Sequence, residues 1–317
     1  MSILQEEVAT SRVLICDHRG EGVLDLARGL RAPGARIEFS QSLRESLERL
    51  ARQRPDLLLV DPLSAGGFHE LEVLDRARAK PGLVPMLLVC ETEDQPAWRR
   101  AGQGMQAPAW DLVPRTASSE ELRVRVARLL GETRLHRELR DLRHRASHDD
   151  RTDLLRPRAF QARLEEHFSA AQRHGLPMTL AMVDLDRFGA VNKEFDHTVG
   201  DEVIERVGEA VRRSLRAEDV AGRVGGDEFA VLLPFTSPED AAGVVERLRL
   251  EIDRVSGLTL ADKPLPLKVS GSIGYAHYDG VNLSDVETLR KRAEDALRRA
   301  KVAGGNRAIP YETSRPD

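Results

Sequence analysis

Short apolar segments alternate with amphipathic stretches through roughly the first 130 residues, and this alternation is the strongest constraint on the fold. The intervals between the apolar segments have the spacing of amphipathic helices. Such alternation is typical of a parallel sheet with helices on both faces, and five units predict a flavodoxin-like order. The segments expected to form strands are residues 12–16, 35–39, 56–60, 84–90 and 111–113.

From residue 118 to residue 150 the pattern becomes continuously helical and highly charged. Fewer than three heptads are clear and Gly131 interrupts them, so a short coiled coil and a plain amphipathic connector both remain open. In either case the segment is expected to link two domains. The apolar stripe has spacings of four, three and four residues and comprises Leu135, Leu139, Leu142 and Ala146.

After residue 150 the order of the elements changes, and two apolar strand segments follow each other directly. Gly225 and Gly226 join them. Because glycine tolerates the positive φ that tight hairpin turns need, we predict a β-hairpin at this point. An antiparallel pair within an α+β sheet that is covered by helices is therefore expected.

Carboxylates gather at this hairpin and at the end of another strand. Asp227 and Glu228 follow the glycines, and the alternation along a strand directs them to opposite sides, which makes Asp227 the better metal ligand. Asp184 and Asp186 follow a buried apolar run. Oxygen ligands at two strand ends can share Mg²⁺, which binds one or two carboxylates plus substrate phosphates. The alternative is that these are solvated acids closing a turn and a strand.

The composition excludes several classes of function. Lys and Arg total 48 against 52 Asp and Glu, and the net charge of -4 offers no basic field to nucleic acid or an anionic membrane. No basic leader and no run of roughly 18 apolar residues occurs, so we expect a cytoplasmic protein without membrane or nucleic-acid partners. Cys16 and Cys90 each end an apolar run and are expected in the core.

The hairpin and its flanks, residues 223–234, resemble the signature of GGDEF domains, the nucleotidyl-cyclase module of diguanylate cyclases. The resemblance extends over roughly 160 residues. Upstream it includes Asp184, Leu185, Asp186, Arg187, Phe188, Asn192, His197, Gly200 and Asp201. Downstream it includes Ser272, Ile273, Gly274, Ala296, Leu297, Ala300, Lys301, Gly304, Asn306 and Arg307. It implies that two GTP molecules condense into cyclic di-GMP, with release of pyrophosphate, in a homodimer.

The resemblance also implies roles for the acidic residues. Asp184, the Leu185 carbonyl and Asp227 would hold Mg²⁺, for which Mn²⁺ could substitute. Glu228 would lie beside the reacting 3′-hydroxyl or the metals. Metal ions in such sites neutralise phosphate charge and lower the pKa of the attacking hydroxyl.

Further residues are implied in substrate binding. Asn192 and Asp201 would read the guanine edge, because a carboxylate accepts from N1–H and the exocyclic amine while an amide supplies complementary bonds. Lys301 would reach the phosphates. Gly225 and Gly226 would line the substrate site.

The chain departs from the family pattern at several positions. Gly189 and Gly305 stand where lysine and arginine are usual, so two phosphate-binding cations are missing. Residues 151–154 read Arg-Thr-Asp-Leu where Leu-Thr-Gly-Leu is usual. These changes leave open a second hypothesis, that the domain binds GTP or cyclic di-GMP as a receptor with little turnover. The intact metal carboxylates favour the enzyme.

Arg216 and Asp219 form an Arg-x-x-Asp motif before the hairpin, where the family has its inhibitory product site. Arginine can bind phosphate or stack on guanine, so the resemblance implies that cyclic di-GMP binds there. A surface salt bridge at a helix end is the alternative.

Asp61 ends the third apolar segment, where receiver domains of response regulators carry their phosphoacceptor. The pocket departs from that family, with Asp17-His18 for the acidic pair, Cys90 for Thr or Ser, and Arg115 for lysine. An imidazole weakens Mg²⁺ coordination. Either a sensor histidine kinase phosphorylates Asp61, or the domain serves dimerisation or ligand sensing. The expected architecture is a receiver-like doubly wound parallel sheet (1–117), a helical linker (118–150) and an α+β nucleotidyl-cyclase-like GGDEF domain (151–317).

Overall fold

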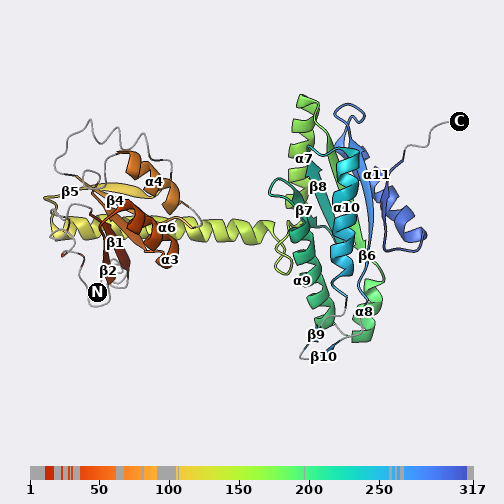
Figure 1. The fold of residues 1–317 in the computed structure, drawn as a ribbon, viewed down its shortest axis with the longest axis horizontal. Helices are drawn as coiled ribbons and strands as arrows, with labels where there is room; N and C mark the ends of the chain where they lie inside the picture. Colours follow the sequence, from red (N-terminus) through yellow and green to blue (C-terminus); the bar gives the residue numbers. More distant parts are fainter. Residues whose placement is uncertain are drawn as a thin grey trace. The chain divides into compact units, whose positions relative to one another are not determined.

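The computed structural model describes residues 11–17, 23, 28, 30, 36–61, 68–79, 82–90, 105, 107–195, 197–256, 259–260, 263–264 and 268–312. The chain divides into two compact units, Met1–Leu142 and Arg143–Asp317. Figure 1 labels the helices and strands of both. Each unit has its own sheet and its own core.

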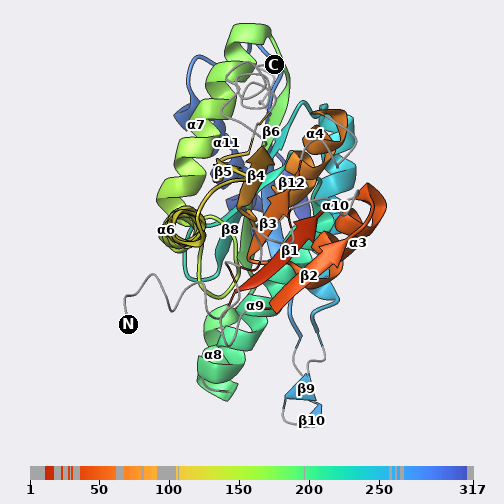
Figure 2. The same ribbon diagram turned by 90° about the vertical axis from the view of Figure 1, so that its left-hand side faces the viewer.

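The first unit is built on a five-stranded parallel sheet. The strands lie side by side in the order β2-β1-β3-β4-β5, as Figure 2 shows, and each neighbouring pair is parallel. This is the predicted flavodoxin-like order, which is therefore confirmed. The strands are β1 (Arg12–Cys16), β2 (Arg36–Ser40), β3 (Leu57–Val60), β4 (Met86–Cys90) and β5 (Trp110–Pro114).

Helices cover both faces of this sheet because successive strand residues point into different cores. Ile15 packs in a cluster with Val126 of the longest helix, whereas its neighbour Leu14 packs with Leu50 and Leu74 on the other face. The sheet is therefore doubly wound, as predicted. The helices of this unit are α3 (Leu43–Gln53), α4 (Phe68–Arg78) and the start of α6 (Ser119–Ser147).

Helix α6 continues beyond that core. Leu122 and Leu129 are buried, but farther along Leu135, Leu139 and Leu142 are exposed. A single helix of 29 residues thus carries the apolar stripe expected from the sequence, with its leucines at the surface. Among the described residues, no helix is both long enough and apolar enough to cross a membrane.

The second unit contains a mixed sheet in the order β12-β11-β6-β8-β7. Strand β6 pairs antiparallel with β8 and β11, β7 pairs antiparallel with β8, and β12 is parallel to β11. The predicted hairpin is the β7–β8 pair. The strands are β6 (Met178–Leu185), β7 (Val220–Arg223), β8 (Glu228–Pro234), β11 (Gly271–Tyr278) and β12 (Ala308–Pro310), with a separate pair β9 (Thr259–Leu260) and β10 (Lys263–Pro264).

Two helical layers cover this sheet. Val183 of β6 packs with Val207 and other residues of one layer, whereas Leu180 packs with Leu164 and Ala293 of the other. Burial on both faces explains why β6 reads as a continuous apolar run. The first layer comprises α9 (His197–Ser214) and α10 (Pro238–Asp253), and the second comprises α7 (Pro157–His174) and α11 (Val286–Val302).

Four short elements were not expected from the sequence pattern, among them the two-residue strands β9 and β10. Helix α8 (Phe188–Phe195) has eight residues and buries only Val191, so it shows no repeated apolar face. Strand β12 has three residues and lies at the edge of the sheet. Short elements of this kind form through tertiary contacts rather than through their own periodicity.

Gly274 of β11 allows α11 to pack directly against the sheet. A Cβ at this position would lie 1.8 Å from the Leu297 nitrogen and 2.4 Å from the Ala293 carbonyl oxygen. Gly274→Ala should therefore lower the free energy of unfolding of this unit by at least about 2 kcal/mol. Gly243→Ala in α10, where nothing lies within 4 Å, should leave it unchanged or raise it by up to about 1 kcal/mol. Urea unfolding measures both, and equal losses would contradict the argument.

Candidate active site

Strand β6 ends beside the turn of the β7–β8 hairpin. Asp184 lies opposite Glu228 in the antiparallel register, and the Leu185 N–H donates to the Asp227 carbonyl at 3.2 Å. Directly opposed residues of antiparallel strands project from the same face of the sheet. The fold thus brings together the four residues to which metal binding and catalysis were assigned.

The glycines of the turn have a different role from the one expected. The N–H groups of Val224 and Gly225 donate to the Glu228 carbonyl at 2.9 and 3.2 Å, which closes the hairpin. Neither Gly225 nor Gly226 has a positive φ, so that expectation was wrong. A Cβ at Gly225 would instead lie 2.3 Å from Glu228 Oε2. Glycine at 225 leaves room for the Glu228 carboxylate, which would have to move away from a larger residue.

Asp184 is held in an unbalanced electrostatic environment. Burial raises the pKa of its carboxyl, and the charges of Asp227 and Asp186 raise it further, although Lys301 acts in the opposite direction. Lys301 Nζ lies 2.5 Å from Asp184 Oδ2. One ammonium therefore compensates only part of the negative charge that converges at this edge of the sheet.

This donor set fits a hard divalent cation that completes its coordination elsewhere. Asp184, Asp227 and the Leu185 carbonyl offer only oxygen, which is the ligand type that Mg²⁺ prefers. Within the described parts of the chain, no three or more His, Cys, Asp or Glu side chains are grouped to hold a metal by themselves. The arrangement suits Mg²⁺, which usually keeps waters and takes further ligands from substrate phosphates.

The Asp186 carboxylate is engaged in hydrogen bonds within the protein and is not free to bind a metal. Its carboxylate accepts from the hydroxyls of Ser270 and Ser272 at 2.8 and 2.6 Å and from the Asn306 N–H at 2.8 Å. These bonds join the end of β6 to β11 and to the segment after α11. Both Asp184 and Asp186 were expected to be available to a metal. Of these two acids at the end of β6, Asp184 remains available.

A cavity of about 690 Å³ adjoins these carboxylates between α7 and α11. Asp184, Glu228 and Lys301 line it together with apolar side chains that include Met182 and Leu297. Because Glu228 is exposed at this cavity, its carboxylate is accessible to a bound molecule. Carboxylates and cations both line this cavity, and such a mixed lining suits a phosphorylated ligand that arrives with a divalent cation. The cations other than Lys301 are Arg158, Arg290 and Arg298.

The residues expected to read guanine lie on two consecutive helices. Asn192 is on α8 and Asp201 is on α9. A Cβ at Gly200 would lie 1.9 Å from Asn192 Oδ1, so the start of α9 is packed against this amide. An ion pair that the sequence did not reveal joins Asp201 to Arg151.

The two glycines that replace family cations differ in their surroundings. Gly189 is exposed on α8 with nothing within 4 Å of an added Cβ. Gly305 has φ +77, and its Cβ would lie 2.9 Å from Asp186 Oδ1. The guanidinium of Arg307 donates to the Gly305 carbonyl at 3.1 Å. A side chain is therefore easily accommodated at 189 but is strained at 305.

Arg216 and Asp219 form a local turn between α9 and β7. The Arg216 N–H donates to Asp219 Oδ2 at 2.8 Å, and the Arg216 side chain is left at the surface. Burial raises the pKa of Asp219, while this hydrogen bond and the charges of Arg216 and Arg247 lower it. Arg247 of α10, which the sequence motif did not include, thus adds a second cation near Asp219.

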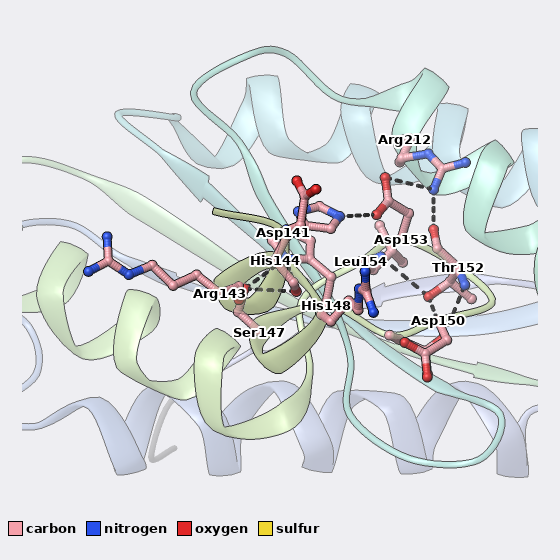
Figure 3. A network of polar contacts seen from close by, with 12 residues as sticks. Asp141, Arg143, His144, Ser147, His148, Asp150, Thr152, Asp153, Leu154 and Arg212 are labelled. Atoms are coloured by element: carbon pink, nitrogen blue, oxygen red, sulfur yellow. Dashed lines mark hydrogen bonds and ion pairs between the residues drawn. The ribbon is translucent and has the colours of Figure 1, made fainter. Parts of the chain in front are cut away.

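A polar network fixes the junction turn, which we define as residues 148–156 between α6 and α7 (Figure 3). His144 Nε2 lies 2.6 Å from Asp153 Oδ1, and Arg212 donates to the Thr152 carbonyl. Asp153 has φ +57 at the position where the family usually has glycine. The substitution noted in the sequence therefore adds a bond to the last turns of α6.

Asp149 connects the junction turn to the hairpin. Its carboxylate accepts from the Thr152 N–H at 3.0 Å and from Arg223 Nη1 at 3.2 Å, and Arg223 Nη2 donates to the Gly226 carbonyl at 2.6 Å. Burial raises the pKa of Asp149, but the bonds from Thr152 and the charge of Arg223 outweigh burial and hold it below its usual value.

In the first unit, Asp61 follows β3 and is buried. Arg115, which follows β5, lies 2.6 Å from it (Nη2 to Oδ2), so the arginine at the usual lysine position reaches the aspartate. Asp17 is also buried after β1 and Cys90 ends β4. His18 lies outside the described residues.

Comparisons with known proteins agree with this geometry. Residues 146–307, just over half of the chain, match the family model described as "Diguanylate cyclase, GGDEF domain". Diguanylate cyclase DgcP of Pseudomonas aeruginosa is 37% identical over 172 residues, which cover 54% of this chain and 25% of that protein. Response regulator PleD of Caulobacter vibrioides is 29% identical over 292 residues, covering 85% of this chain and 63% of PleD.

A solved structure, the coiled coil and GGDEF domain of DgcB from Caulobacter crescentus in complex with c-di-GMP, superimposes with a TM-score of 0.55. It is 27% identical and covers 61% of this chain and all of that one. The chain spans less than two thirds of the length of DgcP and of PleD. The likeness to PleD and the parallel five-stranded sheet are consistent with a receiver-like first unit.

The lowered pKa of Asp149 leads to a prediction about stability. Its ionised form is stabilised by folding, so its contribution is present at neutral pH and is lost as pH falls through the folded-state pKa. Asp149→Asn should lower the free energy of unfolding at pH 7 by about 1–2 kcal/mol, with a smaller loss in acid. The exposed Asp150→Asn is the control. Urea unfolding across this pH range measures the effect, and a pH-independent loss would contradict it.

Proposed function

Because the chain belongs to the GGDEF family of diguanylate cyclase domains, we propose that it condenses two GTP molecules into cyclic di-GMP. The observation that carries the proposal is the pairing of Asp184 with Glu228 across β6 and β8, beside Asp227 and Lys301. A pure binding module has little need of acidic groups that repel a triphosphate, whereas a metal-assisted transfer requires them.

The proposed reaction is two successive transfers. The 3′-oxygen of one GTP forms a bond to the α-phosphorus of the other, the bond from that phosphorus to the bridging oxygen breaks, and pyrophosphate leaves. The reciprocal step closes the ring. Glu228, which is exposed at the cavity, would accept the 3′-hydroxyl proton. Lys301 binds phosphate oxygens once they compete with Asp184 for its ammonium.

Asp184, Asp227 and the Leu185 carbonyl are the residues that would hold Mg²⁺ or Mn²⁺. When bound, the cation neutralises phosphate charge and lowers the pKa of the attacking hydroxyl. One GTP per domain requires two domains to face each other, so the working form is a homodimer. The exposed leucines of α6, at 135, 139 and 142, offer a seam for a second copy.

A second candidate, a receptor for GTP or cyclic di-GMP with little turnover, is favoured by the missing cations at Gly189 and Gly305. Arg307, which matches the family pattern and donates to the Gly305 carbonyl, keeps one positive group nearby. We therefore favour the enzyme. The two functions differ in whether GTP is consumed.

We propose that the first unit regulates this activity. Its strand order is that of a receiver, and the Asp61–Arg115 ion pair places a cation where a phosphoaspartate would need one. A sensor histidine kinase is the partner if Asp61 accepts phosphate. A role in dimerisation or ligand sensing remains the alternative, because Cys90 and His18 replace groups of the usual pocket.

Removal of the metal-binding carboxylates tests the proposed chemistry. Asp184→Asn and Asp227→Asn should each lower pyrophosphate release from GTP and Mg²⁺ by at least about a hundredfold, because each removes an anionic ligand. Glu166→Gln, at an exposed position of α7, is the matched control. Turnover within threefold of the parent in both folded variants would contradict the proposal.

The lost phosphate contacts lead to a prediction about affinity. Gly189→Lys should lower the apparent KM for GTP by about tenfold, since a charge-assisted bond to phosphate contributes roughly 1.5–3 kcal/mol. Gly305→Arg should instead impair the site, because its backbone is left-handed and packed on Asp186. Steady-state kinetics distinguish these effects. An unchanged KM in folded Gly189→Lys would show that phosphate binding is not limiting.

The Arg216–Asp219 turn leads to a prediction about inhibition. Cyclic di-GMP should bind there and inhibit, and Arg216→Ala should raise the inhibitory concentration by at least about tenfold, because a phosphate contact is lost. Calorimetry on Asp184→Asn measures binding without turnover. No binding at tens of micromolar, about six to seven kcal/mol, would reject this site.

A further inference from the structure

Arg151 places a guanidinium beside the carboxylate assigned to guanine. Its Nη1 donates to Asp201 Oδ1, and the two side chains are 50% and 43% exposed. The pair joins the junction turn to α9 across 50 residues of sequence. Both groups remain accessible to a ligand because neither is buried.

The backbone at Arg151 is fixed by its neighbour. Thr152 is fully buried, and a Cβ at Gly208 of α9 would lie 2.7 Å from the Thr152 Cβ, so the turn is packed directly on this helix. Arg212 of the same helix donates to the Thr152 carbonyl. Arg151 is therefore positioned next to α9 by its backbone and does not depend on the ion pair to reach Asp201.

The pair has the hydrogen-bond pattern of one corner of guanine. Guanine presents the O6 acceptor next to the N1–H donor, and the exocyclic amine follows. A carboxylate accepts from N1–H and the amine, and arginine is the side chain that most often donates to guanine O6. The Asn192 amide is packed against Gly200, the residue that precedes Asp201.

We propose that Arg151 is a specificity-determining residue that donates to guanine O6 while Asp201 accepts from N1–H and the amine. This inference rests on the proposed function, since it concerns the same nucleotide. In the free protein Arg151 pairs with Asp201, and on binding it transfers its hydrogen bond to the base.

The strengths of two interactions decide whether Arg151 assists guanine binding or blocks it: its ion pair with Asp201 and its hydrogen bond to the base. An exposed ion pair changes an equilibrium constant by a few-fold at most, so releasing Asp201 costs little. An arginine contact to guanine discriminates between bases by roughly five- to a hundredfold. The gain from the base therefore exceeds the loss of the pair, and Arg151 assists binding rather than opposing it.

Calorimetry on the full chain with Mg²⁺ tests this role. The probes are α,β-methylene-GTP, which cannot be cleaved at the reacting bond, and its 6-thioguanine counterpart, which keeps N1–H and the exocyclic amine but has a weakly accepting sulfur in place of O6. Arg151→Ala should weaken binding of the guanine probe by about five- to a hundredfold and should weaken binding of the thioguanine probe much less. Arg151→Lys should retain part of the preference. Arg163→Ala, which removes an exposed arginine paired with Glu166, should change neither.

The outcomes separate this inference from the proposed function. If the parent binds the guanine probe and Arg151→Ala binds it equally well or more tightly, Arg151 does not read the base and the inference fails alone. Equal weakening of both probes would also overturn it, because the effect would not depend on O6. Absence of binding by the folded parent would overturn the proposed function together with the inference.

Discussion

The antiparallel register between β6 and β8 sets two carboxylates, Asp184 and Glu228, opposite each other, and the rest of the site depends on this pairing. The charges of Asp227 and Asp186 disfavour the ionised form of Asp184 at this buried strand end unless a cation compensates them. Lys301 compensates part of the charge, which explains why the pKa of Asp184 stays raised by burial and by its acidic neighbours. A site of this kind is completed by a divalent cation and phosphates.

The hairpin is connected to the chain that precedes it. Asp149 of the junction turn bonds Arg223, and Arg223 bonds the Gly226 carbonyl, so the turn that carries the acids is fixed from outside the sheet. Because Thr152 also packs on Gly208, a change at the end of α6 would reach both the hairpin and α9.

Much of this arrangement could be predicted from local patterns, because strand–helix alternation and the acids beside the glycines are local features. The register between β6 and β8 was not predictable, since these two strands are far apart in the sequence and other elements lie between them. Alternation along the strand predicted that Asp227 and Glu228 point to opposite sides, but only the structure shows that Glu228 lies opposite Asp184 in the register. Likewise Gly225 was expected to need a positive φ, whereas it has none and instead leaves room for the Glu228 carboxylate. The ion pair of Arg151 with Asp201 joins residues that are 50 apart in the sequence. The spacing of apolar residues along the chain does not predict such a contact.

The most direct test of the proposed activity is to identify the product by mass. The full chain is incubated with GTP and Mg²⁺, and the nucleotides are separated and identified by mass spectrometry, with ATP alone as the control. The account predicts cyclic di-GMP from GTP, two pyrophosphates for each molecule formed, and no cyclic product from ATP. Unchanged GTP in the presence of folded, nucleotide-binding protein would contradict it.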